Sequence, residues 1–98
     1  MIELKARLVE RSVTRYSPAG VPVLECRLDH RSTQLEAEVP REVEFVIKAL
    51  ALGKIVEQLE SIAPGTELAV QGFLAPSRKG SHTLLLHITA LQCLPEVA

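Results

Sequence analysis

The sequence has few aromatic residues and no tryptophan. Its 98 residues include one tyrosine and two phenylalanines. Aromatic side chains fill cores and also provide the flat surfaces on which nucleic-acid bases stack. Their scarcity predicts few stacking positions at any nucleic-acid site.

Cysteine pairs and long apolar runs are also missing. Cys26 and Cys93 have neither CxxC spacing nor a neighbouring histidine, which disfavours a zinc site or a disulfide framework. We interpret both as buried structural thiols. No apolar run reaches the roughly 18 residues that span a bilayer. The alternating start, Met1 to Lys5, does not fit a signal peptide. We therefore expect a cytoplasmic protein that does not contact a membrane.

Catalytic motifs are absent as well. The three histidines, His30, His82 and His87, accompany no nucleophile elbow, no Gly-rich loop after a strand and no carboxylate pair beside a His-rich segment. We interpret His87 as a packed or interface residue rather than a catalytic base. The sequence predicts no enzyme, no metal and no cofactor.

Charge of one sign is not in excess, since 11 Lys and Arg face 12 Asp and Glu, for a net charge of −1. A nucleic-acid binder is usually basic, although local clustering rather than total charge attracts phosphate. Residues 14–22 and 75–83 contain cations and no acid. The acids gather elsewhere: Glu36, Glu38, Glu42, Glu44, Glu57 and Glu60. One side of the protein can therefore be basic.

Polar and apolar residues alternate in five stretches, which predicts five strands at about 2–9, 21–30, 34–39, 66–74 and 83–93. The third would place Leu35, Ala37 and Val39 inward, and Pro40 predicts a bulge, an edge position or a break. The last would place Leu84, Leu86, Ile88 and Ala90 on one face. Between the third and fourth strands, the apolar residues of 52–62 have helical spacing.

This order indicates a single all-β domain over residues 1–98. Five strands with a short helix between strands 3 and 4 are the elements of an OB-fold barrel, whereas an SH3-like barrel normally lacks that helix. An OB-fold binds oligonucleotides on strands 2 and 3, between the loops that join strands 1–2 and 4–5.

Candidate residues for single-stranded DNA binding lie in these places. The set comprises Arg15, Tyr16, Arg27, Arg31, Phe73, Arg78, Lys79 and His82. Tyr16 is the better stacking candidate, while Phe45, in an apolar run, is interpreted as core. Phe73 could stack on a base or pack in a subunit contact. Arg78 and Lys79 could also be an ordinary solvated turn.

Several motifs in combination point to a known family. Ser17-Pro18-Ala19-Gly20-Val21-Pro22 is followed by His30-Arg31-Ser32, then by Val70-Gln71-Gly72-Phe73-Leu74 and Leu86-His87. Together they resemble the primosomal replication protein N (PriB-type) family across nearly the whole chain. The resemblance implies a homodimeric OB-fold that binds single-stranded DNA and stimulates the PriA helicase at stalled replication forks. By position, Arg15, Arg31, Arg78 and Lys79 match cations of the family.

Two departures from the family pattern bear on affinity. Well-known members carry a third-strand tryptophan, where this chain has the region around Glu44, and a cation just before the fifth strand, where it has Thr83. A missing stack costs about 1–3 kcal/mol per base, so weaker or more arginine-dependent DNA binding is expected.

Two other functions are compatible with the sequence. One is a protein-interaction module that mainly docks a replication helicase, with DNA contact incidental. The other is a general single-strand-binding protein, which we disfavour because such proteins usually carry a long tail with an acidic tip, whereas this chain stops at Pro95-Glu96-Val97-Ala98.

Overall fold

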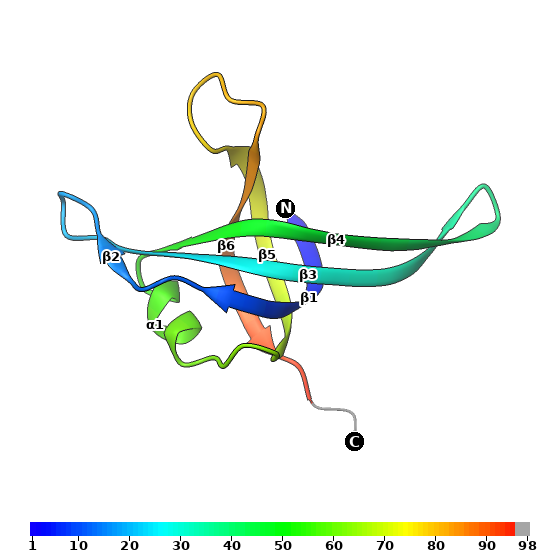
Figure 1. The fold of residues 1–98 in the computed structure, drawn as a ribbon, viewed down its shortest axis with the longest axis horizontal. Helices are drawn as coiled ribbons and strands as arrows, with labels where there is room; N and C mark the ends of the chain where they lie inside the picture. The colour runs from blue at the N-terminus through cyan, green and yellow to red at the C-terminus, as the bar shows by residue number, and fades with distance from the viewer. Residues whose placement is uncertain (96–98) are drawn as a thin grey trace.

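The first strand, β1 (Ile2–Arg11), closes the sheet on itself in the computed structural model, which describes residues 1–95 (Figure 1). It pairs antiparallel with β5 (Glu67–Pro76) through residues 2–7 and with β3 (Pro22–Glu36) through residues 7–11. The sheet order is β1-β5-β6-β4-β3-β2, with the β1–β3 pairing completing a five-stranded barrel. β2 (Arg15–Tyr16) is a two-residue extension on β3. The all-β barrel prediction is confirmed.

The short helix, α1 (Ile55–Glu60), follows β4 (Val39–Leu52) and precedes β5. It therefore lies between the fourth and fifth strands rather than between the third and fourth, because the unanticipated β2 shifts the count. The helix is shorter than the predicted 52–62. Val56 and Leu59 are buried in it, while Leu52 stays in β4 and Ile62 is buried just after it. No helix within residues 1–95 is long and apolar enough to cross a membrane.

The core of the barrel is aliphatic. The largest fully buried side chains are leucines and valines, and none of the buried residues is aromatic or charged among those that the structure describes. They come from every barrel strand and from α1. The main core cluster contains Ala6, Leu8, Leu24, Cys26, Leu28, Ala49, Ala51, Val56, Leu59, Ile62, Leu68, Val70, Leu86, Ile88 and Leu91.

A bulge alters the face of β6 (Leu84–Cys93). Its pairing with β5 shifts between Gln71 and Gly72, whose partners are Ala90 and Ile88. One extra residue, Thr89, therefore lies in β6, and the inward alternation continues at Leu91. The prediction that Ala90 faces inward is wrong for this reason, since a bulge reverses the faces that follow it. Leu84 is half exposed because it lies at the strand's open end.

β3 and β4 form one continuous hairpin that extends beyond the barrel (Figure 1). The predicted gap between strands at 30–34 does not exist, and the chain turns at Ala37 and Glu38, both with positive φ. Leu35 and Val39 are 77% and 61% exposed, so their predicted inward position is wrong. Pro40 lies in the part of β4 that pairs with β3 alone, which confirms the edge position.

Candidate nucleic-acid interface

The outer face of β3 carries two of the predicted arginines. Leu24, Cys26 and Leu28 point into the core, so the alternating residues 25, 27, 29 and 31 face outward. Arg27 and Arg31 therefore share a face, because side chains two residues apart on a strand point the same way.

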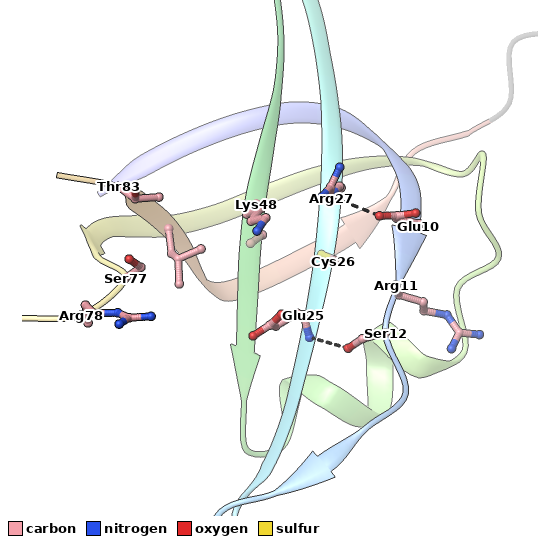
Figure 2. Close-up of a pocket in the computed structure, with 12 residues that line it drawn as sticks. Glu10, Arg11, Ser12, Glu25, Cys26, Arg27, Lys48, Ser77, Arg78 and Thr83 are labelled. Carbon is pink, nitrogen blue, oxygen red and sulfur yellow. Dashed lines mark hydrogen bonds and ion pairs between the residues drawn. The ribbon is translucent and has the colours of Figure 1, made fainter. Parts of the chain in front are cut away.

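A groove of about 650 Å³ lies between this face and the loop that joins β5 to β6 (Figure 2). Arg27 lies on its floor, on β3, and Arg78 reaches in from the loop with its guanidinium toward β3 and β4. The groove thus brings together two cations that are 51 positions apart in the sequence. The lining residues are Glu10, Arg11, Ser12, Glu25, Cys26, Arg27, Lys48, Ala49, Ser77, Arg78, Thr83 and Leu85.

Four cationic and two acidic residues line the groove. Glu10 pairs with Arg27 at 3.2 Å between Oε1 and Nε. Glu25 pairs with Arg15 at 3.1 Å, which links the predicted first-loop cation to the groove's edge. Arg11 donates to the carbonyl oxygen of Ile62 and points away from the groove (Figure 2). Exposed ion pairs of this kind contribute little, about 0–1 kcal/mol, so a phosphate can compete for the arginines.

Arg31 lies outside this groove, in a neighbouring depression with Arg7 and Asp29. The Asp29 carboxylate accepts from Arg7 at 3.1 Å and lies 3.4 Å from Arg31. Arg31 also lies 3.7 Å from the carboxylate of Glu44. Two acids therefore balance Arg31, and its charge is less available to a phosphate than that of Arg78.

The predicted aromatic positions are exposed. Tyr16 is 69% exposed on β2. Phe73 is 49% exposed on the outer face of β5 and stacks on His87, with ring centroids 4.9 Å apart and an interplanar angle of 8°. His87, interpreted as a packed or interface residue, thus packs against Phe73 on the outer face of the barrel. Phe45 is also partly exposed and lies against His30, so its interpretation as core is wrong.

Lys79 and His82 lie exposed in the β5–β6 loop and do not line the groove. Lys48, on β4, does line it and was missed by sequence reasoning. Its one signal is that it interrupts the otherwise uncharged stretch from Phe45 to Gly53. Such an interruption marks an outward position on a strand but not a function.

The two cysteines differ. Cys26 is buried beneath the groove, and burial raises the pKa of its thiol to about 12. Cys93 is exposed at the end of β6. The prediction of a buried thiol is confirmed for Cys26 and wrong for Cys93, because Cys93 is the last residue of β6 and lies beyond the buried core.

Known proteins resemble this chain over most of its length. The sequence profile of a family described as "Another single-strand binding protein family" matches residues 1–90. Replication restart protein PriB of Bordetella pertussis is 48% identical over 87 residues, which are 89% of this chain and 81% of the relative. The PriB of Vibrio cholerae is 37% identical over 89 residues, which are 88% of this chain and 89% of the relative.

Solved structures agree with these matches. The PriB protein of Ralstonia solanacearum superposes with a TM-score of 0.87 at 47% identity, over 94% of both chains. The single-stranded DNA binding protein of Thermus aquaticus shares the fold, with a TM-score of 0.73 at 22% identity over 95% of this chain and 48% of its own. This chain belongs to the PriB family of replication restart proteins, within the wider single-strand-binding OB-fold group.

Proposed function

We propose that the protein binds single-stranded DNA along the groove between β3, β4 and the β5–β6 loop, as a non-catalytic accessory protein of replication restart. The observation that carries this proposal is the convergence of Arg27, Lys48 and Arg78 on the face where OB-folds take oligonucleotides. Membership of the PriB family supports the setting of replication restart.

In this proposal the cations bind backbone phosphates and the exposed rings stack on bases. Arg27 and Arg78 would contact phosphate in the groove, with Lys79 and His82 flanking it on the loop. Arg15 and Arg31 would contribute at its edges once phosphate competes with their carboxylate partners. Tyr16 and Phe73 are the two candidates for stacking. With so few rings, binding depends mainly on cations and is sensitive to salt.

Fluorescence anisotropy with labelled poly-dT tests the proposal. We expect saturable binding whose affinity falls as salt rises, because phosphate contacts release counterions. Charge reversal at both Arg78 and Lys79 should abolish measurable binding, whereas reversal at Lys54, a surface cation before α1 and outside the groove, should not. Tight binding that is unaffected by salt, or undisturbed by the double reversal, would contradict the proposal.

The PriB resemblance also supports partners and setting. We propose that the chain acts as a single OB-fold domain, residues 1–98, in a cytoplasmic homodimer that stimulates a PriA-type helicase at stalled forks. Sedimentation equilibrium tests the dimer, since the mass should be twice the 10.7 kDa of one chain. A mass of one chain at micromolar concentration would contradict it.

A second candidate function is helicase docking with only incidental DNA contact. It is favoured by the part of the β3–β4 hairpin beyond the barrel, residues 31–46, here called the arm. The arm is exposed and acidic, with Glu36, Glu38, Glu42 and Glu44 on it. If charge reversal of Arg78 and Lys79 leaves DNA binding intact but ends helicase stimulation, docking is the main function.

A further inference from the structure

Two cations stand directly opposite each other on the floor of the groove. Arg27 of β3 and Lys48 of β4 are register partners in the antiparallel ladder, and both face outward. Facing side chains in such a pair have Cβ atoms about 4.5–5.5 Å apart, and like charges there destabilise a sheet. For stability alone, an acid or an uncharged residue would be better at either position.

The repulsion is only partly offset. Arg27 has one partner, the carboxylate of Glu10 at 3.2 Å. Lys48 has no ion pair or side-chain hydrogen bond within residues 1–95, and its neighbours in the groove wall include Ala49 and Leu85. Arg78 likewise has no ion pair there and reaches toward the same space from the loop (Figure 2). Positive charge therefore converges from β3, β4 and the loop.

We propose that Lys48, with Arg27 and Arg78, forms a seat for one backbone phosphate of single-stranded DNA, and that this seat lowers the stability of the unbound protein. The inference rests on the proposed function and deepens it. The two guanidinium groups can each bind phosphate oxygens in a fork, and Lys48 adds a compact charge beneath. The hydroxyls of Ser77 and Thr83 also line the groove and can donate to the same anion.

Lys48→Gln tests the seat, because glutamine keeps much of the side-chain bulk and removes the charge. Affinity for labelled poly-dT should fall roughly tenfold, as the loss of one charge-assisted contact implies. The slope of log affinity against log salt should become shallower by about 0.7. The midpoint of thermal unfolding should rise, since the repulsion with Arg27 is relieved, and an unchanged midpoint would contradict the destabilising effect of the seat.

Two variants control the measurement. Lys54→Gln removes one charge outside the groove and should change affinity less than about twofold, since screening weakens distant charges. Lys48→Arg keeps the charge and should retain both affinity and salt slope.

The outcomes separate the two proposals. If the unaltered protein binds poly-dT and Lys48→Gln binds equally well, the seat is wrong while the proposed function stands. If Lys48→Gln loses both affinity and thermal stability, Lys48 is structural and the seat is again wrong. If the unaltered protein does not bind poly-dT even at low salt, the proposed function fails and the seat fails with it.

Discussion

The thiols of Cys26 and Cys93 should differ sharply in reactivity. Alkylation proceeds through the thiolate, and burial raises the pKa of Cys26 to about 12, so it stays a thiol at neutral pH. Cys93 is exposed. We expect maleimide to add one label to the folded protein and two in denaturant, as measured by mass spectrometry.

A matched variant assigns the label. Folded Cys93→Ser should take up no maleimide within the time that fully labels the unaltered protein. Rapid labelling of that variant would mean that Cys26 is accessible and that the floor of the groove is open.

For individual residues, the sequence indicated the cations but not the acids or the opposite residues that they face. Arg27 and Arg78 were both identified, because one lies on a predicted strand exterior and the other in an acid-free loop. Arg31 was identified on the same grounds, yet Asp29 and Glu44 balance its charge. Lys48 was missed because its importance comes from standing opposite Arg27, and strand register sets that pairing.

Gly72 is needed where β5 passes β6 at the bulge. A Cβ at this position would collide with the backbone carbonyl of His87. Gly72→Ala should therefore destabilise the protein by about 2 kcal/mol or more, because backbone on both sides must shift. This corresponds to a drop of roughly 10 °C in the midpoint of thermal unfolding.

Gly80 offers the comparison. It has φ +80 and open space around it, so Gly80→Ala meets no neighbour and costs only the local backbone strain, about 1 kcal/mol. An equal or smaller loss for Gly72→Ala than for Gly80→Ala would show that the β5–β6 backbones are not packed as closely as described.

The hairpin turn explains why the third predicted strand was placed wrongly. Residues 30–34 read as a polar break, whereas the chain continues and turns at Ala37 and Glu38. Both central residues have positive φ, 51° and 66°, the conformation of a type I′ turn, which normally takes Asn-Gly. Since neither residue type signals such a turn, sequence reasoning could not locate it.

Replacing Ala37-Glu38 by Asn-Gly should stabilise the protein. Left-handed backbone costs an ordinary residue about 1–2 kcal/mol, and Asn-Gly relieves most of it. For two residues this comes to about 2 kcal/mol, so we expect the thermal midpoint to rise by roughly 8–16 °C if the arm unfolds with the barrel. Ala19→Gly, in a loop where no positive φ is needed, should not raise it. No gain from Asn-Gly would mean that the arm melts separately or turns differently.

For the whole molecule, the near-zero net charge hides a separation. Cations converge on the groove, while four of the 12 acids lie on the arm. The acid-free loops indicated that one side could be basic, but of their cations only Arg78 lines the groove, and the others that line it come from strands. The sequence did not indicate the arm, because the arm depends on the misplaced turn. The arm also extends the shape, giving a radius of gyration of 14.5 Å, against about 12.5 Å for a compact chain of this length.

The arm contributes nothing to the buried core. Every residue from 33 to 42 is exposed, and Ser32 and Val43 are register partners at its base. Replacing Thr33–Glu42 by Asn-Gly therefore keeps the ladder in register. The new turn would join Ser32 to Val43, which lie four residues along the ladder from Glu36 and Val39, the pair that the present turn joins. Because hydrogen-bonded and non-hydrogen-bonded pairs alternate along the ladder, these two pairs are of the same type. The groove residues are all retained.

This shortened protein separates the two proposed functions. We expect its thermal midpoint and its affinity for poly-dT to match those of the unaltered protein, since neither the core nor the groove has changed. If the arm docks a helicase, helicase stimulation should fall while DNA binding persists, and the Lys48→Gln variant should show the reverse. Loss of poly-dT binding in a stably folded shortened protein would instead place the DNA on the arm and overturn the groove as its site.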